Sequence, residues 1–135
     1  MGRIGIREGI AKSYYENGRL QEEIPYKNYE MEGIARIYYE SGKLKMEVPY
    51  KAGAIKGIVK DYHENGNLSK ETPYKNGLRE GVMMIYRENG KILATITYDN
   101  NSPVSGICHH TDGRTSPLTN AEVTNWENGF GIACD

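Results

Sequence analysis

The sequence lacks an excess of charge of either sign and lacks long apolar runs. It contains 17 lysines and arginines against 18 aspartates and glutamates, which leaves a formal net charge of -1. This balance provides no basic field of the kind that drives nucleic-acid binding, so no nucleic-acid partner is expected. The longest apolar stretches are only a few residues, so no transmembrane segment is expected either. Tryptophan and phenylalanine occur once each, whereas tyrosine occurs 11 times.

Glycine and tyrosine recur at a fixed period of 24 residues. Successive units open at Gly9, Gly33, Gly57 and Gly81, carry Tyr14, Tyr38, Tyr62 and Tyr86 five residues later, and turn at Gly18, Gly42, Gly66 and Gly90. A period of this length is typical of repeat architectures, in which each unit packs on its neighbours. Residues 5–9 resemble residues 77–81, so we interpret residues 1–8 as a partial repeat.

The pattern inside each unit predicts a β-hairpin. Two short runs rich in β-branched and aromatic residues flank Asn17-Gly18, and Asn-Gly is the strongest short-range hairpin signal. We expect a two-residue type I′ turn, in which Glu16 faces Arg19 and Lys12 faces Glu23. The same register pairs Arg36 with Glu47 and Lys60 with Glu71, and opposed charges of this kind stabilise a sheet by roughly 0.2–1 kcal/mol. The alternative, a three-residue loop with a bulge, would set Lys60 against Lys70.

This register gives each unit an apolar face and a polar face. The expected apolar face of the second unit carries Ala35, Ile37, Tyr39, Leu44, Met46, Val48 and Tyr50. A single hairpin is marginally stable in water, and stacking the hairpins side by side buries the shared face. The predicted fold is therefore all-β: four consecutive 24-residue β-hairpins over residues 9–105 that form an elongated antiparallel sheet.

The pattern decays after Tyr98, and residues 106–135 are interpreted as a degenerate repeat with a helical cap. Thr119 and Glu122 form a capping box, which predicts a short helix that carries Trp126. Asn128-Gly129 predicts the end of that helix. Terminal units of repeat arrays must cover an exposed edge, so we expect this helix to cap the last edge of the sheet.

Cys108 and Cys134 are the only cysteines, and they bracket the predicted helix. We favour a disulfide between them over buried free thiols. A disulfide favours a periplasmic or secreted protein over a cytoplasmic one. The neighbouring His109, His110 and Asp112 invite a metal site, but their spacing matches no standard zinc pattern, and no metal or cofactor is expected.

The candidate interaction face carries a file of tyrosines, Tyr14, Tyr38, Tyr62 and Tyr86, beside the cations Arg36 and Lys60. One interpretation is structural: these rings pack on the neighbouring Ile10, Ile34, Ile58 and Val82 and stiffen the sheet. The functional interpretation is an aromatic groove for a peptide, another subunit or a sugar chain. No nucleophile–base pair and no phosphate-binding loop occurs, so an enzyme is not expected.

The first strand is a second candidate for interaction. Ile4, Ile6 and Ile10 make residues 3–15 apolar, and an unpaired edge is a template for another strand. We expect either an upstream repeat or a homodimer through this N-terminal edge.

The units resemble the bacterial variant of the MORN repeat, whose usual wording is close to Y-Y-E-N-G-K-L-x-x-E-x-P-Y-K-N-G-x-x-x-G. Here the motif reads Tyr38-Tyr39-Glu40-Ser41-Gly42-Lys43-Leu44, then Glu47-Val48-Pro49-Tyr50-Lys51-Ala52-Gly53, then Gly57, and the resemblance covers residues 5–101. It implies an elongated sheet of hairpins and a scaffold that contacts proteins or lipids. Many bacterial members are labelled as the antitoxin component of a toxin–antitoxin pair.

From the residues and the resemblance together we predict a non-enzymatic repeat scaffold that binds another protein, with an antitoxin- or immunity-like role as a special case. The alternative is an envelope-associated module that binds carbohydrate or lipid. Repeats that bind glucans typically use Trp-Tyr pairs, and no repeat here contains tryptophan.

Overall fold

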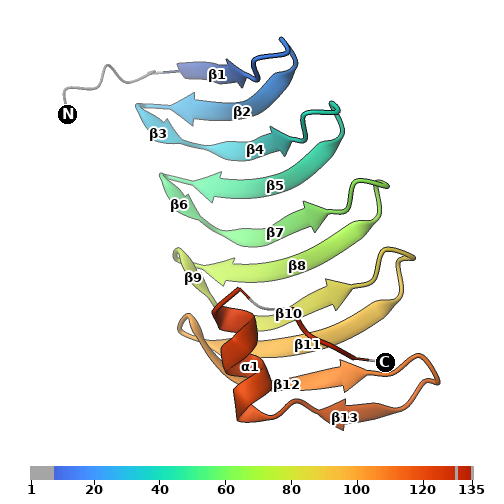
Figure 1. Cartoon of the computed structure of the whole chain (residues 1–135). Coiled ribbons are helices and arrows are strands. Elements are labelled where there is room, and N and C mark those ends of the chain that lie inside the picture. Colours follow the sequence, from blue (N-terminus) through green and yellow to red (C-terminus); the bar gives the residue numbers. More distant parts are fainter. Residues whose placement is uncertain (1–7, 130, 135) are drawn as a thin grey trace.

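A computed structural model describes residues 8–129 and 131–134 of the chain. These residues form one open antiparallel sheet of 13 strands and a short C-terminal helix, α1 (Figure 1). The strands are β1 (Glu8–Tyr14), β2 (Leu20–Lys27), β3 (Glu30–Met31), β4 (Gly33–Tyr38), β5 (Leu44–Lys51), β6 (Ala54–Ile55), β7 (Gly57–Tyr62), β8 (Leu68–Lys75), β9 (Leu78–Arg79), β10 (Gly81–Tyr86), β11 (Ile92–Asp99), β12 (Ser102–His109) and β13 (Thr115–Pro117). The all-β repeat fold is confirmed. The partial repeat predicted over residues 1–8 lies outside the described residues, except for Glu8.

Apart from the short strands β3, β6 and β9, successive strands are neighbours in the sheet, so the chain folds as a meander. Within each unit a long hairpin such as β4–β5 is followed by a short strand such as β6, which folds back on the end of β5. Three of the four predicted charge pairs are confirmed: Lys12 lies opposite Glu23, Arg36 opposite Glu47 and Lys60 opposite Glu71. The fourth, Glu16 opposite Arg19, is wrong, because Tyr15 is the residue that pairs with Arg19.

The predicted two-residue turn at Asn17-Gly18 is wrong. The backbone N–H of Tyr15 donates to the carbonyl of Arg19, and that of Gly18 donates to the carbonyl of Tyr15, so the loop has three residues. The Asn17 side chain explains the difference, because its Oδ1 accepts the N–H of Arg19 at 2.9 Å. This local hydrogen bond lets Asn17 keep a negative φ, and only Gly18 takes a positive one, 86°.

A bulge in the returning strand compensates for the longer loop. In the second unit Tyr38 lies opposite Leu44 and Ile37 opposite Met46, so Lys45 is the extra residue. The bulge restores the charge register, and for this reason Lys60 never meets Lys70. It also corrects one assignment. Residues directly opposite each other share a face, so Leu44 lies with Tyr38 rather than on the apolar face.

The type I′ geometry occurs instead at the turns that connect one unit to the next. At residues 28–29, 52–53, 76–77 and 100–101, both turn residues have positive φ. Glycine takes the second position in two of these turns, as Gly53 and Gly77. The first turn places Tyr29 there, with a φ of 68° and a side chain that is 60% exposed.

Replacing Tyr29 by glycine is therefore expected to stabilise the protein. A left-handed conformation costs a side-chain-bearing residue about 1 kcal/mol or more, and the exposed ring offers little packing to lose. Urea unfolding followed by circular dichroism should show a gain of about 0.5–1 kcal/mol, after the greater chain entropy of glycine is allowed for. The reverse change at the matched position, Gly53→Tyr, should destabilise. A loss of stability in Tyr29→Gly would contradict the assigned turn.

Side chains at the end of each first strand tie neighbouring units together. The Tyr15 hydroxyl donates to the backbone carbonyl of Tyr38, and Tyr39 donates to that of Tyr62. In the next two units a ring nitrogen of His63 lies 3.1 Å from the carbonyl of Tyr86, and Arg87 donates to that of His109. Different residue types therefore serve one structural role.

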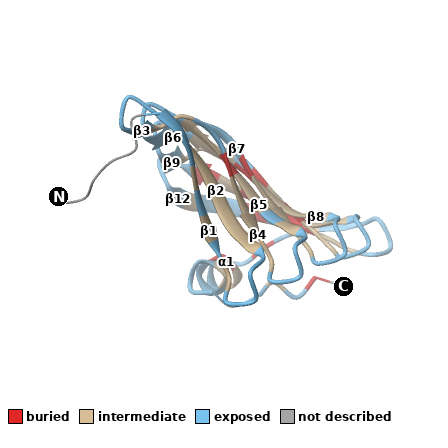
Figure 2. Ribbon diagram, turned by 90° about the horizontal axis from the view of Figure 1, so that it is seen from above, coloured by how far each residue is buried: buried red, intermediate tan, exposed pale blue. Residues whose placement is uncertain are grey.

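Side chains from alternate positions form two different faces. We call the face on which α1 lies the helix face and the opposite one the tyrosine face. The core lies on the helix face in two clusters. One centres on Ala35, Val48 and Val59, and the other lies beneath α1. Figure 2 shows that the buried segments lie along the strands, whereas the turns at both ends are exposed.

The predicted helix is confirmed at Asn120–Glu127, but its predicted place is wrong. The Thr119 side chain accepts the N–H of Glu122, and Glu122 accepts that of Thr119, which completes the capping box. The helix packs on the face of the sheet over β10 to β12 rather than on its edge (Figure 1). The last edge is formed by β13, only three residues long. A short edge strand needs less protection, which leaves the helix free to cover apolar surface. No helix in the described ranges has the length and apolarity needed to span a membrane.

Candidate binding surfaces

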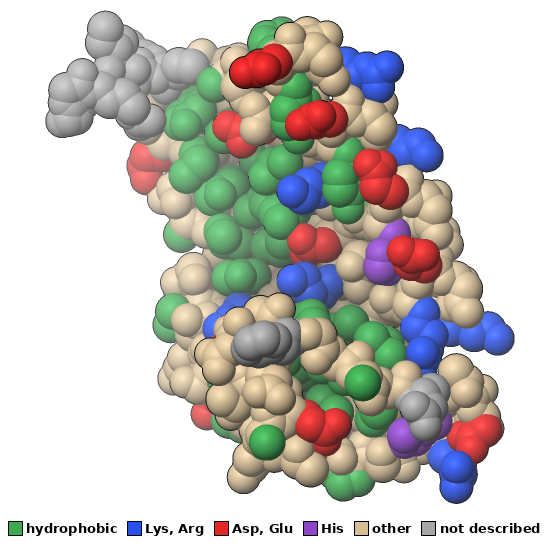
Figure 3. All heavy atoms as spheres, in the orientation of Figure 1, with side chains coloured by type: hydrophobic (Ala, Val, Ile, Leu, Met, Phe, Trp, Pro, Cys, Tyr) green, Lys and Arg blue, Asp and Glu red, His purple; other side chains and the backbone are tan. Residues whose placement is uncertain are grey.

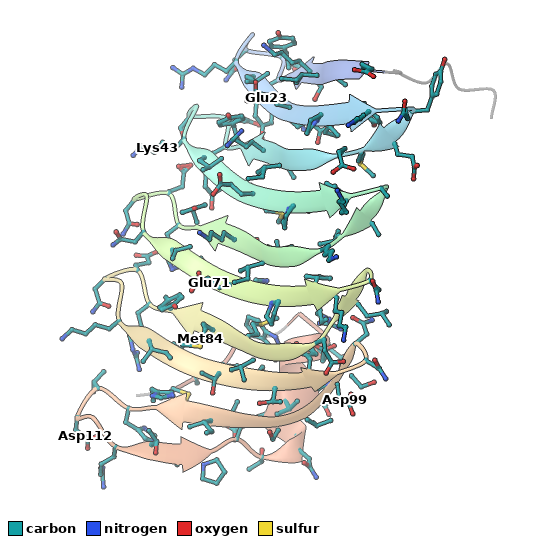
Figure 4. The ribbon with its side chains drawn as sticks, turned by 180° about the vertical axis from the view of Figure 1, so that it is seen from behind. Glu23, Lys43, Glu71, Met84, Asp99 and Asp112 are labelled. Carbon is teal, nitrogen blue, oxygen red and sulfur yellow. A yellow bond between two sulfur atoms is a disulfide. The ribbon has the colours of Figure 1, made fainter. Side chains whose placement is uncertain are left out.

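The tyrosine face carries a ladder of hydrogen bonds between units. Tyr38 donates to Glu23 at 2.7 Å, and the same bond recurs from Tyr62 to Glu47 at 2.8 Å and from Tyr86 to Glu71 at 2.7 Å. Figure 4 shows this face from behind, with Glu23 and Glu71 labelled. The hydroxyls of these three predicted site residues are thus engaged with the preceding unit. Tyr14, which begins the file, is 59% exposed.

The predicted cations lie in the same rows. Arg36 pairs with Glu47 at 3.3 Å, and Lys12 lies 3.9 Å from Glu23. Lys60 lies opposite Glu71. The glutamates and burial together make these tyrosines weaker acids: the hydrogen bond to Glu71, and then burial, raises the pKa of Tyr86 to about 12. Burial, followed by the bond to Glu47, raises the pKa of Tyr62 to about 12 as well.

The helix face is covered only at its C-terminal end. There Leu118 and Val123 are buried against β10, β11 and β12, and Trp126 is partly buried beside them. Cys108 and Cys134, in the same cluster, lie at disulfide-bonding distance with Cα atoms 5.7 Å apart.

A polar clamp fixes the end of α1. The Arg79 guanidinium donates to both carboxylate oxygens of Glu127 at 3.0 Å and stacks 4.3 Å above the ring of Tyr98. The Tyr98 hydroxyl donates to the same carboxylate at 2.6 Å. Burial raises the pKa of Glu127, but the hydrogen bonds from Arg79 and Tyr98 outweigh it and lower that pKa overall. This clamp joins residues 48 positions apart.

Over the second and third units the helix face is uncovered. Figure 3 shows hydrophobic side chains gathered on this face beyond the end of α1. A hollow of about 340 Å³ lies there, lined by Ile37, Met46, Val48, Tyr50, Ile55, Val59, Asp61, Lys70, Thr72, Tyr74, Arg79 and Met83. It shares Lys70, Arg79 and Met83 with a second hollow of about 410 Å³ that reaches Trp126 and Glu127. The open surface is thus continuous with the interface of α1.

Three charged residues line this hollow, and one of them is Arg79 of the clamp. The other two, Asp61 and Lys70, lie opposite each other in the third unit, where the second unit has Ile37 and Met46. Burial raises the pKa of Asp61, and the charges of Lys70 and Lys45 oppose that rise only in part. The Lys70 ammonium lies 5.5 Å from the ring of Trp126. The surface is therefore apolar with one polar crossing, a composition common in ligand and protein sites.

The repeat pattern did not indicate this open surface as a site, nor the clamp of Arg79, Tyr98 and Glu127. One signal was present, because Arg79 stands where the two preceding units have Met31 and Ile55, although Arg7 occupies the same column in the partial repeat. A cation at a position where neighbouring units are apolar indicates a partner carboxylate. Its partner lies in the helix, outside the repeat, so the period alone could not identify it.

The comparisons agree with the repeat. The family model described as MORN repeat variant matches four consecutive stretches, at residues 7–28, 31–52, 56–76 and 79–100. No curated protein sequence matches the chain.

Proposed function

The chain belongs to the MORN repeat variant family, and from this premise we propose that it is a non-enzymatic scaffold that binds another protein on the open part of its helix face. MORN repeats are generally associated with binding to proteins or membrane lipids. One observation supports the choice of surface: the face that α1 covers over the fourth unit continues uncovered over the second and third.

The helix α1 indicates how this face accepts a partner. Val123 and Trp126 of α1 pack in the same apolar cluster as Met83 and Ile96 of the sheet, and Glu127 of α1 pairs with Arg79. The open part offers the equivalent column positions, with Val59 in place of Met83 and Tyr74 in place of Tyr98. The tyrosine face is less suited, because the hydroxyls of Tyr38, Tyr62 and Tyr86 already donate to glutamates of the sheet. Its role in binding stays a prediction.

A matched pair of variants tests the proposal. Met46→Arg places a charge on the helix face, and Ile34→Arg places the same charge on the tyrosine face of the same hairpin, at a side chain that is 47% exposed. The immobilised wild-type chain and both variants are incubated with a lysate of the native cells. We expect one protein to be recovered in near-stoichiometric amount by the wild type and by Ile34→Arg, and to be lost with Met46→Arg.

Circular dichroism must first show that both variants fold. Equal recovery by the two variants would contradict the helix face as the site. Parallel sedimentation with lipid vesicles and with envelope polysaccharide tests the alternative. Binding there that Met46→Arg abolishes, with no protein recovered, would favour the carbohydrate- or lipid-binding function. An antitoxin- or immunity-like role would require the recovered protein to be a toxin that this chain neutralises.

A further inference from the structure

The strand β1 lies at one end of the described sheet and pairs there with β2 alone. The first strand of each later unit pairs on both sides; β4, for example, lies between β2 and β5. In β4, β7 and β10 the side that faces the preceding unit is thus occupied by the second long strand of that unit. The same position beside β1 is empty among the described residues, so its requirements can be derived by comparison.

The preceding strand supplies a glutamate in each case. Glu23 lies opposite Arg36, Glu47 opposite Lys60 and Glu71 opposite Met84. The same three glutamates accept the hydroxyl hydrogen bonds of Tyr38, Tyr62 and Tyr86. Each glutamate thus lies opposite the middle of the next strand, and its carboxylate accepts a hydrogen bond from the tyrosine at the end of that strand.

The preceding strand also supplies a proline two residues after that glutamate. A side chain built on Gly33 would lie 3.3 Å from Cγ of Pro25. Gly57 and Gly81 have the same relation to Pro49 and Pro73, each at 3.2 Å. The proline ring of one unit therefore packs against the glycine that opens the next unit, where a side chain would leave it little space.

Among the described residues, each of these partners is missing beside β1. Lys12 lies 3.9 Å from Glu23 of its own hairpin, and Tyr14 is 59% exposed, with no hydrogen bond from its hydroxyl inside the described ranges. At Gly9 an added side chain would meet nothing within 4 Å. The N–H of Tyr15 points toward β2, where it donates to Arg19, so alternation turns the N–H and C=O of Lys12 and Tyr14 outward.

We infer that the edge of β1 binds an extended strand of a partner polypeptide whose sequence places a glutamate two residues before a proline. The backbone of that strand pairs with the outward groups around Lys12, its carboxylate lies between Lys12 and the Tyr14 hydroxyl, and its proline ring packs on Gly9. Strand addition of this kind takes affinity from main-chain hydrogen bonds and specificity from alternate side chains. This site is separate from the helix face, and its test does not depend on the proposed function.

A peptide with the sequence of residues 44–51, blocked at both ends, is a direct probe. It carries the glutamate and proline of β5. Titrated into the isotopically labelled full chain at concentrations up to about 1 mM, it should shift the backbone amide signals of residues 9–14 and few others. The Glu47→Gln peptide should bind at least about threefold more weakly, because it loses an opposed charge.

Two protein variants provide the matched control. Tyr14→Phe should weaken peptide binding by about the same factor as the peptide variant. Tyr86→Phe removes an equivalent hydroxyl whose glutamate is already in place, so it should leave peptide binding unchanged. Equal binding of the two peptides, equal effects of the two variants, or shifts confined to the helix face would overturn the inference. So would an absence of shifts, or a dimer that blocks the peptide, since a second copy would then be the occupant.

Discussion

Replacing Gly106 by valine is expected to lower the free energy of unfolding by about 3 kcal/mol, because it overpacks the contact between the sheet and the C-terminal segment. A Cβ atom at this position would lie 2.6 Å from Cδ1 of Leu118 and 3.1 Å from the carbonyl oxygen of Thr95. Leu118 can yield only by leaving its place in the core, and the Thr95 carbonyl belongs to β11. The backbone N–H of Leu118 also donates to the carbonyl of Gly106 at 2.9 Å. The two segments therefore cannot move apart to admit the larger side chain without losing this bond.

The measurement is urea unfolding followed by circular dichroism, with Trp126 fluorescence as a local probe. Partly buried Trp126 should emit at a longer wavelength in Gly106→Val before the sheet unfolds, because the variant loosens α1 first. Gly131→Val is the matched control, since a side chain there would meet nothing within 4 Å. Similar losses in the two variants would show that the contact between Leu118 and Gly106 does not hold the segment.

Those parts of the fold that depend on the repeat period could be predicted from the sequence. The strands, their order and the charge register all follow from residues 24 positions apart, such as Arg36 and Lys60, which must occupy equivalent places. The turn type could not be predicted in this way. Asn17 can supply either a positive φ or a side-chain acceptor for Arg19, and the choice between them depends on the bulge that follows.

The helix shows the same division between local and distant causes. Its start follows from the capping box of Thr119 and Glu122 and its end from Asn128-Gly129, and both are local signals. Its place on the face depends on the pair of Arg79 and Glu127 and on the space left by Gly106, both contacts with distant residues. The tyrosine file was likewise correctly placed on one face. Its hydrogen bonds to glutamates of the preceding unit required the spacing of adjacent hairpins, which periodicity does not give.

Breaking the bond between Cys108 and Cys134 is expected to have an effect of similar size. The two residues are 26 positions apart, and closing a loop of that length stabilises the folded state by about 3.5 kcal/mol in the chain-entropy model. The loop contains α1 and Leu118, so reduction should weaken the cover of the fourth unit more than the hairpins of the first three. A reductant that forms no mixed disulfide with the protein, such as a phosphine, should lower the urea midpoint of the wild-type chain.

The variant in which both cysteines are replaced by alanine separates this effect from others. It should unfold at lower urea than the oxidised wild type and should not respond to the reductant. Intact mass before and after alkylation shows directly whether the thiols of the purified chain are free. If the wild type and the double variant have the same stability under oxidising conditions, then α1 is held by its packing and by the clamp of Arg79 and Glu127 alone. If they differ as expected, the bond between Cys108 and Cys134 contributes to holding α1 on the fourth unit, and reduction lowers the free energy needed to detach it.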